Sequence, residues 1–183
     1  MREFIAFDME DTSTARGMLQ DSFFSDRCVR QVGGDELHLT LNFLGEVDPS
    51  VNGSIEEAME EAASGFPSYH IDFKGVGAFP SQERPSVIWI GVADRGETAM
   101  LNAILSERLA KLGFKPESRP FHPHLTVARV KCRVDPSLLT SFFEKWAGME
   151  FGSQNVRKVV LKKSDLTPEG ARHTPLYSTR LRT

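Results

Sequence analysis

The chain has 183 residues, of which 40% are hydrophobic and 26% are charged, and its formal net charge is −3 at pH 7. This length allows one ordinary domain or two small lobes that share one body. The mild negative charge argues against a general nucleic-acid coat protein, which would usually be basic. No apolar run approaches membrane-spanning length, and the N-terminus becomes acidic too early for a signal peptide, so we expect no membrane association.

The chain contains two cysteines, Cys28 and Cys132, and they form no Cys-x-x-Cys motif. Such sparse cysteine usage is typical of a reducing compartment and predicts a cytoplasmic protein. A single bridge between the two cysteines stays open as an alternative.

The first part of the chain predicts a strand over residues 2–8, a helix over about 10–25 and a strand over 36–44. Asp48-Pro49 then marks a helix start, because Asp accepts hydrogen bonds from the first free N–H groups and Pro has none to lose. That helix places its apolar stripe on Ile55, Ala58, Met59 and Ala62.

The middle of the chain alternates polar and apolar residues over 69–74, which predicts a half-buried strand, and residues 75–80 are interpreted as a turn or bulge. Residues 87–92 are wholly apolar and predict a strand buried on both faces. An apolar stripe then predicts a helix that ends at Gly113 and is lined by Leu101, Ile104, Leu105, Leu109 and Leu112.

The last part predicts a strand over about 121–131, a helix, and strands near 155–163 and 175–182. Strands and helices alternate in both halves of the chain, which predicts an α+β fold. We expect one compact domain over residues 1–183. The last helix is lined by Leu138, Leu139, Phe142, Phe143 and Trp146.

The strongest signal is a kernel that occurs twice, as His38-Leu-Thr40 and as His124-Leu-Thr126. Residues two apart on a strand share a face, so each copy presents an imidazole and a hydroxyl to the same side. Both copies are followed by Val-Asp-Pro-Ser, at 47–50 and at 134–137. This duplication favours two similar lobes whose kernel strands face each other.

Two imidazoles and two hydroxyls are suited to displacement at phosphorus. One histidine removes a proton from the nucleophile and the other protonates the leaving oxygen, each contributing about 10²–10⁴-fold to the rate. The hydroxyls of Thr40 and Thr126 can hold the non-bridging oxygens, and no metal is needed. A zinc site made of His38, His122 and His124 is the alternative, but it leaves both threonines without a role.

Arg129 is a candidate phosphate clamp, since a guanidinium group binds phosphate through two hydrogen bonds. On a flat strand Arg129 would point away from His124, so this role requires a bulge or a strong twist. His70 and His173 are interpreted as ordinary surface or structural histidines. Phe43, Phe79 and Tyr177 could stack on a base, with core packing as the alternative.

These motifs resemble those of the two-histidine (2H) phosphoesterases, and in particular the RNA 2′,3′-cyclic phosphodiesterases also called 2′-5′ RNA ligases. The resemblance runs through most of the chain. It rests on Arg2-Glu-Phe-Ile-Ala-Phe7, Leu37-His-Leu-Thr-Leu-Asn-Phe-Leu-Gly-Glu-Val47, Gly77-Ala-Phe-Pro80, Pro85-Ser-Val-Ile-Trp-Ile-Gly91, Phe121-His-Pro-His-Leu-Thr-Val-Ala-Arg-Val-Lys131 and the closing Ser164, Leu166, Gly170 and Tyr177.

The resemblance implies a bilobal fold with pseudo-two-fold symmetry, in which two antiparallel sheets face a central cleft and helices pack outside. It implies hydrolysis of an RNA terminal 2′,3′-cyclic phosphate to a 2′-phosphomonoester, together with weak, reversible 2′-5′ RNA ligation, without a cofactor. His38 would donate the proton, His124 would activate water, and Thr40 and Thr126 would hold the phosphate. The expected partner is RNA with such an end, for example tRNA fragments, bound by a monomer.

Two other classes of function stay open at this point. The cleft could belong to an RNA-binding module that holds a phosphate without turning it over. A related 2H enzyme could instead act on a small cyclic nucleotide or on an ADP-ribose cyclic phosphate, and a panel of substrates would separate these readings.

Overall fold

The structure, a computed structural model, describes residues 1–32, 37–168 and 170–183. Its elements in chain order are β1 (Arg2–Asp8), α1 (Ser13–Met18), η1 (Ser22–Ser25), β2 (Val29–Gln31), β3 (His38–Glu46), η2 (Pro49–Val51), α2 (Asn52–Gly65), β4 (Tyr69–Pro80), β5 (Pro85–Ala93), α3 (Glu97–Lys111), β6 (His124–Val130), α4 (Pro136–Trp146), β7 (Glu150–Val156), β8 (Lys158–Thr167) and β9 (Gly170–Arg180). In the described part of the chain, no helix is long and apolar enough to cross a membrane.

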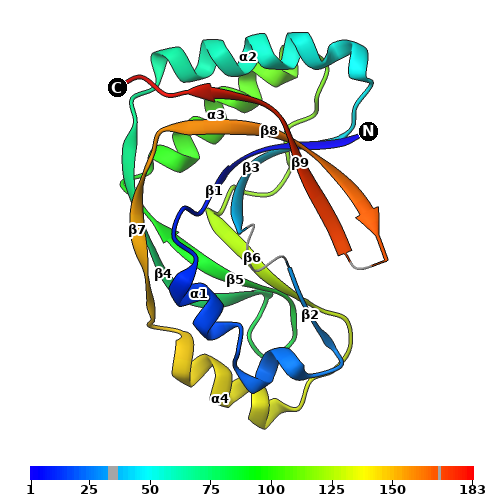
Figure 1. Cartoon of the computed structure of the whole chain (residues 1–183), viewed down its shortest axis with the longest axis vertical. Coiled ribbons are helices and arrows are strands. Elements are labelled where there is room, and N and C mark those ends of the chain that lie inside the picture. Colours follow the sequence, from blue (N-terminus) through cyan, green and yellow to red (C-terminus); the bar gives the residue numbers. More distant parts are fainter. Residues whose placement is uncertain (33–36, 169) are drawn as a thin grey trace.

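One antiparallel sheet runs through the molecule in the order β7-β4-β5-β6-β3-β1-β8-β9, and β2 pairs with β6. We call β3, β1, β8 and β9 the β3 half, and β6, β5, β4 and β7 the β6 half. Helices α2 and α3 lie against the β3 half, whereas α1, η1 and α4 lie against the β6 half (Figure 1). The predicted α+β fold with antiparallel strands and outer helices is confirmed, and the two expected sheets are joined edge to edge through β3 and β6.

Each half of the sheet draws strands from both halves of the sequence. The chain leaves the β3 half after β1, returns to it with β3, and crosses again between α2 and β4 and between β7 and β8 (Figure 1). The halves of the fold are therefore interleaved in the sequence and cannot be separated by one cut.

The helices bury the apolar stripes that the sequence predicts. Ile55, Met59 and Leu105 are fully buried, and Phe142 stacks on Phe23 of η1 with ring centroids 4.2 Å apart. The side chain of Asp135 accepts hydrogen bonds from the backbone at the start of α4, as the Asp-Pro pattern predicts. At the first copy of this pattern, Asp48 caps the short turn η2, and α2 follows from Asn52.

Three predicted elements differ from the structure. The expected helix over 10–25 is two short pieces, because the Asp21 side chain accepts from the Phe23 N–H and starts a new turn at η1. The expected strand near 155–163 is divided between β7 and β8. The strand at 87–92 is buried on one face only: Ile88 and Ile90 are fully buried, whereas Trp89 is half-buried.

Residues 75–80 continue β4 instead of ending it. A register shift lies between Phe73 and Val76, and Gly75 adopts a positive φ of 79° there. The predicted turn or bulge is therefore a bulge within a long strand.

The two cysteines form a disulfide, with a Cα–Cα distance of 5.0 Å between Cys28 and Cys132. It joins the residue before β2 to the loop after β6. The open alternative of a single bridge is therefore the one that the structure contains.

Candidate active site

The two kernels meet where β3 and β6 pair. Leu39 lies opposite Leu125 in antiparallel register, and both side chains are fully buried. The histidine and threonine on either side of each leucine point to the other face of the sheet, where they are half-buried. Antiparallel register also sets His38 across from Thr126 and Thr40 across from His124. The predicted set of two histidines and two threonines therefore gathers on one face.

Each kernel is followed by a β-bulge at the same position. On β3 the pairing with β1 runs from Thr40 to Asn42 and skips Leu41. On β6 the pairing with β5 runs from Thr126 to Ala128 and skips Val127. The duplication thus extends from the sequence to the irregularity of the backbone.

The bulge on β6 decides where Arg129 points. On β5, Val87, Trp89 and Gly91 alternate and share one face, and their partners on β6 are Arg129, Thr126 and His124, respectively. Arg129 therefore lies on the face of the kernel, and its side chain is exposed. The sequence predicts that Arg129 can share the face of His124 only if the strand has a bulge or a strong twist. The structure contains that bulge.

The equivalent position on β3 is held by Phe43. Phe4 and Ala6 share one face of β1, and they pair with Phe43 and Thr40. Phe43 is 61% exposed although it is aromatic, so it lies on the site face without core packing. The two halves thus place an exposed phenylalanine and an exposed arginine at matching positions.

The other two aromatic candidates have different surroundings. Phe79 packs edge-on against the ring of His124, with centroids 5.0 Å apart. Tyr177 donates a hydrogen bond to Glu60 of α2, on the helix side of the sheet. Tyr177 is therefore placed away from the kernels.

A hydrogen bond to the backbone two residues earlier fixes the orientation of the His124 ring. Its Nδ1 donates a hydrogen bond to the backbone carbonyl of His122 at 2.6 Å, since a carbonyl only accepts. Nε2 is then the nitrogen left to accept a proton. Burial lowers the pKa of His124 below its ordinary 6.5, and this effect outweighs the hydrogen bond to His122, which raises it. His124 is therefore neutral near pH 7.

Trp89 forms a wall beside His124. Its ring lies 5.1 Å from that of His122 and 6.3 Å from that of His124, measured between centroids. The indole occupies the space over Gly77, where an added Cβ would come within 2.3 Å of the ring. Gly77 is thus required by a close approach between β4 and β5, a requirement that the motif Gly75-Val-Gly77 alone does not reveal.

His38 has different neighbours. Its ring stacks on Phe4 with centroids 5.0 Å apart, and His173 of β9 meets it edge-on at 4.9 Å. Asp8 is its cross-strand partner on β1. Asp8 also pairs with Lys162, whose side chain is only 7% exposed. His173, interpreted from the sequence as an ordinary histidine, and Asp8 are therefore neighbours of His38 that no sequence motif indicates.

The structure does not assemble the alternative three-histidine zinc site. Among the described residues there is no group of three or more His, Cys, Asp or Glu side chains that could hold a metal ion. His122 is exposed, and its carbonyl oxygen rather than its ring contacts the Nδ1 of His124.

Comparison with known proteins shows one family over most of the chain. Residues 16–164 match the model of the 2′-5′ RNA ligase superfamily. The RNA 2′,3′-cyclic phosphodiesterase of Archaeoglobus fulgidus is 39% identical over 179 residues, which cover 97% of this chain and 96% of that protein.

Two solved structures share the fold. The protein TT0787 of Thermus thermophilus superposes with a TM-score of 0.82 at 24% identity, and E. coli LigT complexed with 3′-AMP superposes with a TM-score of 0.75 at 25% identity. Each comparison covers 100% of this chain and 98% of the other.

Proposed function

This chain belongs to the 2′-5′ RNA ligase superfamily, and we propose that it is an RNA 2′,3′-cyclic phosphodiesterase that opens a terminal cyclic phosphate to a 2′-phosphomonoester. The observation that carries the proposal is the pairing of the two kernels about Leu39 and Leu125, which gathers two imidazoles and two hydroxyls on one face. An in-line displacement at phosphorus requires an acid and a base on opposite sides of the phosphorus atom.

His124 takes the role of base in this proposal. Its Nδ1 is occupied by the His122 carbonyl and burial keeps the ring neutral, so Nε2 can accept a proton from water. The water oxygen forms the new bond to phosphorus as it loses that proton. These local properties support the assignment of the base to β6 independently of the family resemblance.

His38 takes the role of acid. The bond between phosphorus and O3′ breaks, and the imidazolium of His38 gives its proton to O3′. Asp8 is the cross-strand neighbour of His38 on β1 and forms an ion pair with Lys162. Thr40 and Thr126 hold the non-bridging oxygens of the reacting phosphate, and Arg129, on the same face, contributes to binding the rest of the substrate.

The proposal also covers the domain organisation, oligomeric state, location, RNA substrate and metal dependence of the protein. We propose that the chain works as a single domain over residues 1–183, as a monomer in the cytoplasm, on RNA ends such as those of tRNA fragments. We also propose that the reaction is independent of metal, because the face supplies its own acid, base and hydrogen-bond donors. The same step with a 5′-hydroxyl group in place of water as the nucleophile would give a 2′-5′ linkage, and O3′ would leave as before.

The test is incubation with an oligoribonucleotide that ends in a 2′,3′-cyclic phosphate, before and after exhaustive chelation, with the product phosphate located by ³¹P NMR. A 2′-phosphate formed at the same rate in both samples supports the proposal. A 3′-phosphate product would contradict the assigned bond cleavage. Loss of activity that zinc restores would contradict metal independence, and turnover of ADP-ribose cyclic phosphate alone would favour the small-molecule alternative.

A further inference from the structure

Strand β2 continues the pairing of β6 at the point where β3 ends its contact. β3 pairs with β6 at Leu125, whereas β2 pairs with the last three residues of β6. In this pairing Arg30 lies directly opposite Arg129. We infer that Arg30 and Arg129 form a second anion site, which binds the phosphodiester preceding the terminal cyclic phosphate of an RNA chain. This inference rests on the proposed function and names the feature that would distinguish an RNA chain from a mononucleotide.

The orientation of β2 places Arg30 on the site face. Val29, with 9% exposure, lies among the buried residues, and the side chain of Gln31 donates to the Leu19 carbonyl at 3.1 Å on the side of α1. Arg30, between them, points the other way, as does its partner Arg129. Its Nη2 donates to the carbonyl of Pro168 at 3.3 Å, which lies at the end of the β8–β9 hairpin that belongs to the β3 half (Figure 1).

The positive charges of Arg30 and Arg129 are not balanced by an ion pair with any carboxylate among the described residues. Like charges directly opposite each other destabilise a sheet, and no described carboxylate forms an ion pair with Arg30 or Arg129. The neutral Pro168 carbonyl accepts from one of the five N–H donors of Arg30. An anion between the two guanidinium groups would relieve the repulsion and take up the remaining donors in the bidentate geometry that phosphate favours.

The position of the pair indicates a phosphate other than the reacting one. Arg129 lies three residues beyond Thr126 on β6, roughly 7–10 Å along the strand, and Arg30 is on the next strand. The reacting phosphate is assigned to the kernels, where both histidines can reach it. The next acceptor for an arginine pair at this distance is a neighbouring phosphodiester, which an RNA chain has and a cyclic mononucleotide lacks.

Two features hold β2 in place beside β6. The Cys28–Cys132 disulfide closes one end of the pair, where the Lys131 N–H also donates to the Cys28 carbonyl at 2.8 Å. At the other end, the Val32 N–H donates to the Val127 carbonyl at 2.9 Å. The backbone that carries Arg30 is thus fixed before an anion arrives, which lowers the entropic cost of binding it.

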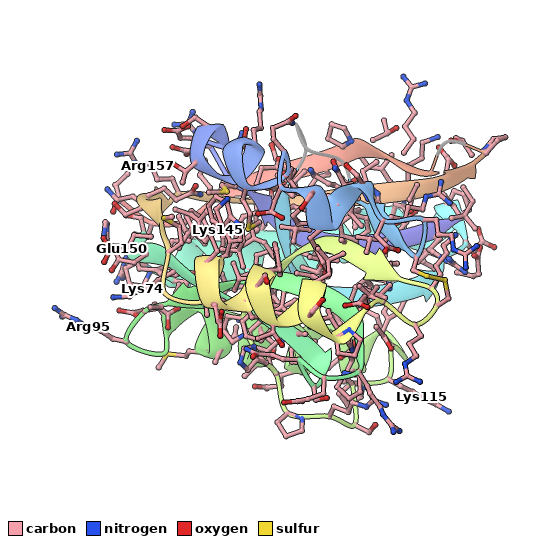
Figure 2. All side chains as sticks on the ribbon, turned by 90° about the horizontal axis from the view of Figure 1, so that it is seen from below. Lys74, Arg95, Lys115, Lys145, Glu150 and Arg157 are labelled. Atoms are coloured by element: carbon pink, nitrogen blue, oxygen red, sulfur yellow. A yellow bond between two sulfur atoms is a disulfide. The ribbon has the colours of Figure 1, made fainter. Side chains whose placement is uncertain are left out.

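The experiment compares kcat/KM for a cyclic mononucleotide with that for an oligoribonucleotide carrying the same end. Arg30→Gln is expected to lower the ratio of oligonucleotide to mononucleotide kcat/KM about tenfold, mainly through KM. The slope of log kcat/KM against log salt for the oligonucleotide should fall by about 0.7, as for one lost phosphate contact. Arg95→Gln makes the same charge change on an exposed side chain that projects away from the body (Figure 2), and should leave both quantities unchanged.

An unchanged ratio in Arg30→Gln would overturn the inference, as would equal losses for both substrates with an unchanged salt slope. Arg30→Lys keeps one charge and should retain most of the salt dependence, and it provides the measurement if Arg30→Gln unfolds at a lower temperature. If the wild-type protein hydrolyses neither substrate, the proposed function fails on its own. The arginine site is then tested by fluorescence anisotropy with an oligonucleotide ending in a 2′-phosphate, which Arg30→Gln should bind about tenfold more weakly.

Discussion

The β3 half and the β6 half share a backbone design but surround their histidines differently. Both contain the His-Leu-Thr kernel, a bulge after it and an Asp-Pro turn beyond it. His124 is enclosed by Trp89 and Phe79 and fixed by the His122 carbonyl, whereas His38 lies between Phe4 and His173 with Asp8 across from it. The repeated backbone thus brings two like groups together, and the unrepeated neighbours give them different surroundings.

The first prediction tests what the halves have in common. His38→Ala and His124→Ala should each lower kcat by about 10²–10⁴-fold, because each removes one proton transfer. Circular dichroism and thermal unfolding should show that both variants remain folded. His70→Ala is the matched control, since His70 is exposed and its ring contacts Asn155 and Asp72 on the surface of the β6 half. Near wild-type activity in either kernel variant would exclude the two-histidine mechanism.

The second prediction separates the two roles. A substrate with an activated leaving group at the 3′ position needs little help from an acid, so it should restore kcat in His38→Ala about tenfold more than in His124→Ala. The measurement is kcat for both variants with natural and activated substrates. Equal restoration, or a larger effect in His124→Ala, would reverse the assignment and leave the shared mechanism intact.

The third prediction perturbs the β6 half alone. Gly77→Ala would push a Cβ into the Trp89 ring and should destabilise the fold by about 1–3 kcal/mol. A displaced indole should also admit water to His124, so the acid limb of the pH–rate profile should move to higher pH. Gly53→Ala in α2 is the control, because nothing lies within 4 Å of its added Cβ. An unmoved acid limb in a destabilised Gly77→Ala protein would show that Trp89 does not set the pKa of the base.

The fourth and smallest effect is on the pH dependence of the stability of the fold. Burial lowers the pKa of His124 in the folded protein, so below pH 6.5 the unfolded chain binds a proton that the folded one resists. This cost is absent above pH 6.5 and grows as pH falls through the interval between the two pKa values. The Tm of the wild type relative to His124→Gln should therefore decrease between about pH 7 and pH 5. A constant difference in Tm would show that His124 titrates alike in both states.

Local patterns in the sequence identified the parts of the site that lie on single strands. The repeated His-x-Thr spacing predicted which four side chains share a face, because period two is a property of any strand. The Asp-Pro pairs marked turns and a helix start, and the apolar stripes of α2, α3 and α4 predicted their buried residues. The prediction of one helix over 10–25 was wrong because the Asp21 side chain caps a new turn and interrupts the helix. Apolar periodicity does not reveal such a hydrogen bond between a side chain and the backbone.

The sequence by itself predicted the candidate reacting groups and indicated the family, since both depend on residue types at short spacing. The tertiary structure alone decided which residues surround each histidine: His173 reaches His38 through the pairing of β9 with β8, and Arg30 meets Arg129 because β2 follows β6. It also decided the face of Arg129, because one bulged residue reverses the alternation that the sequence predicts. Strand pairing joins residues far apart in the chain, and neither its register nor its bulges follow from the composition of one strand.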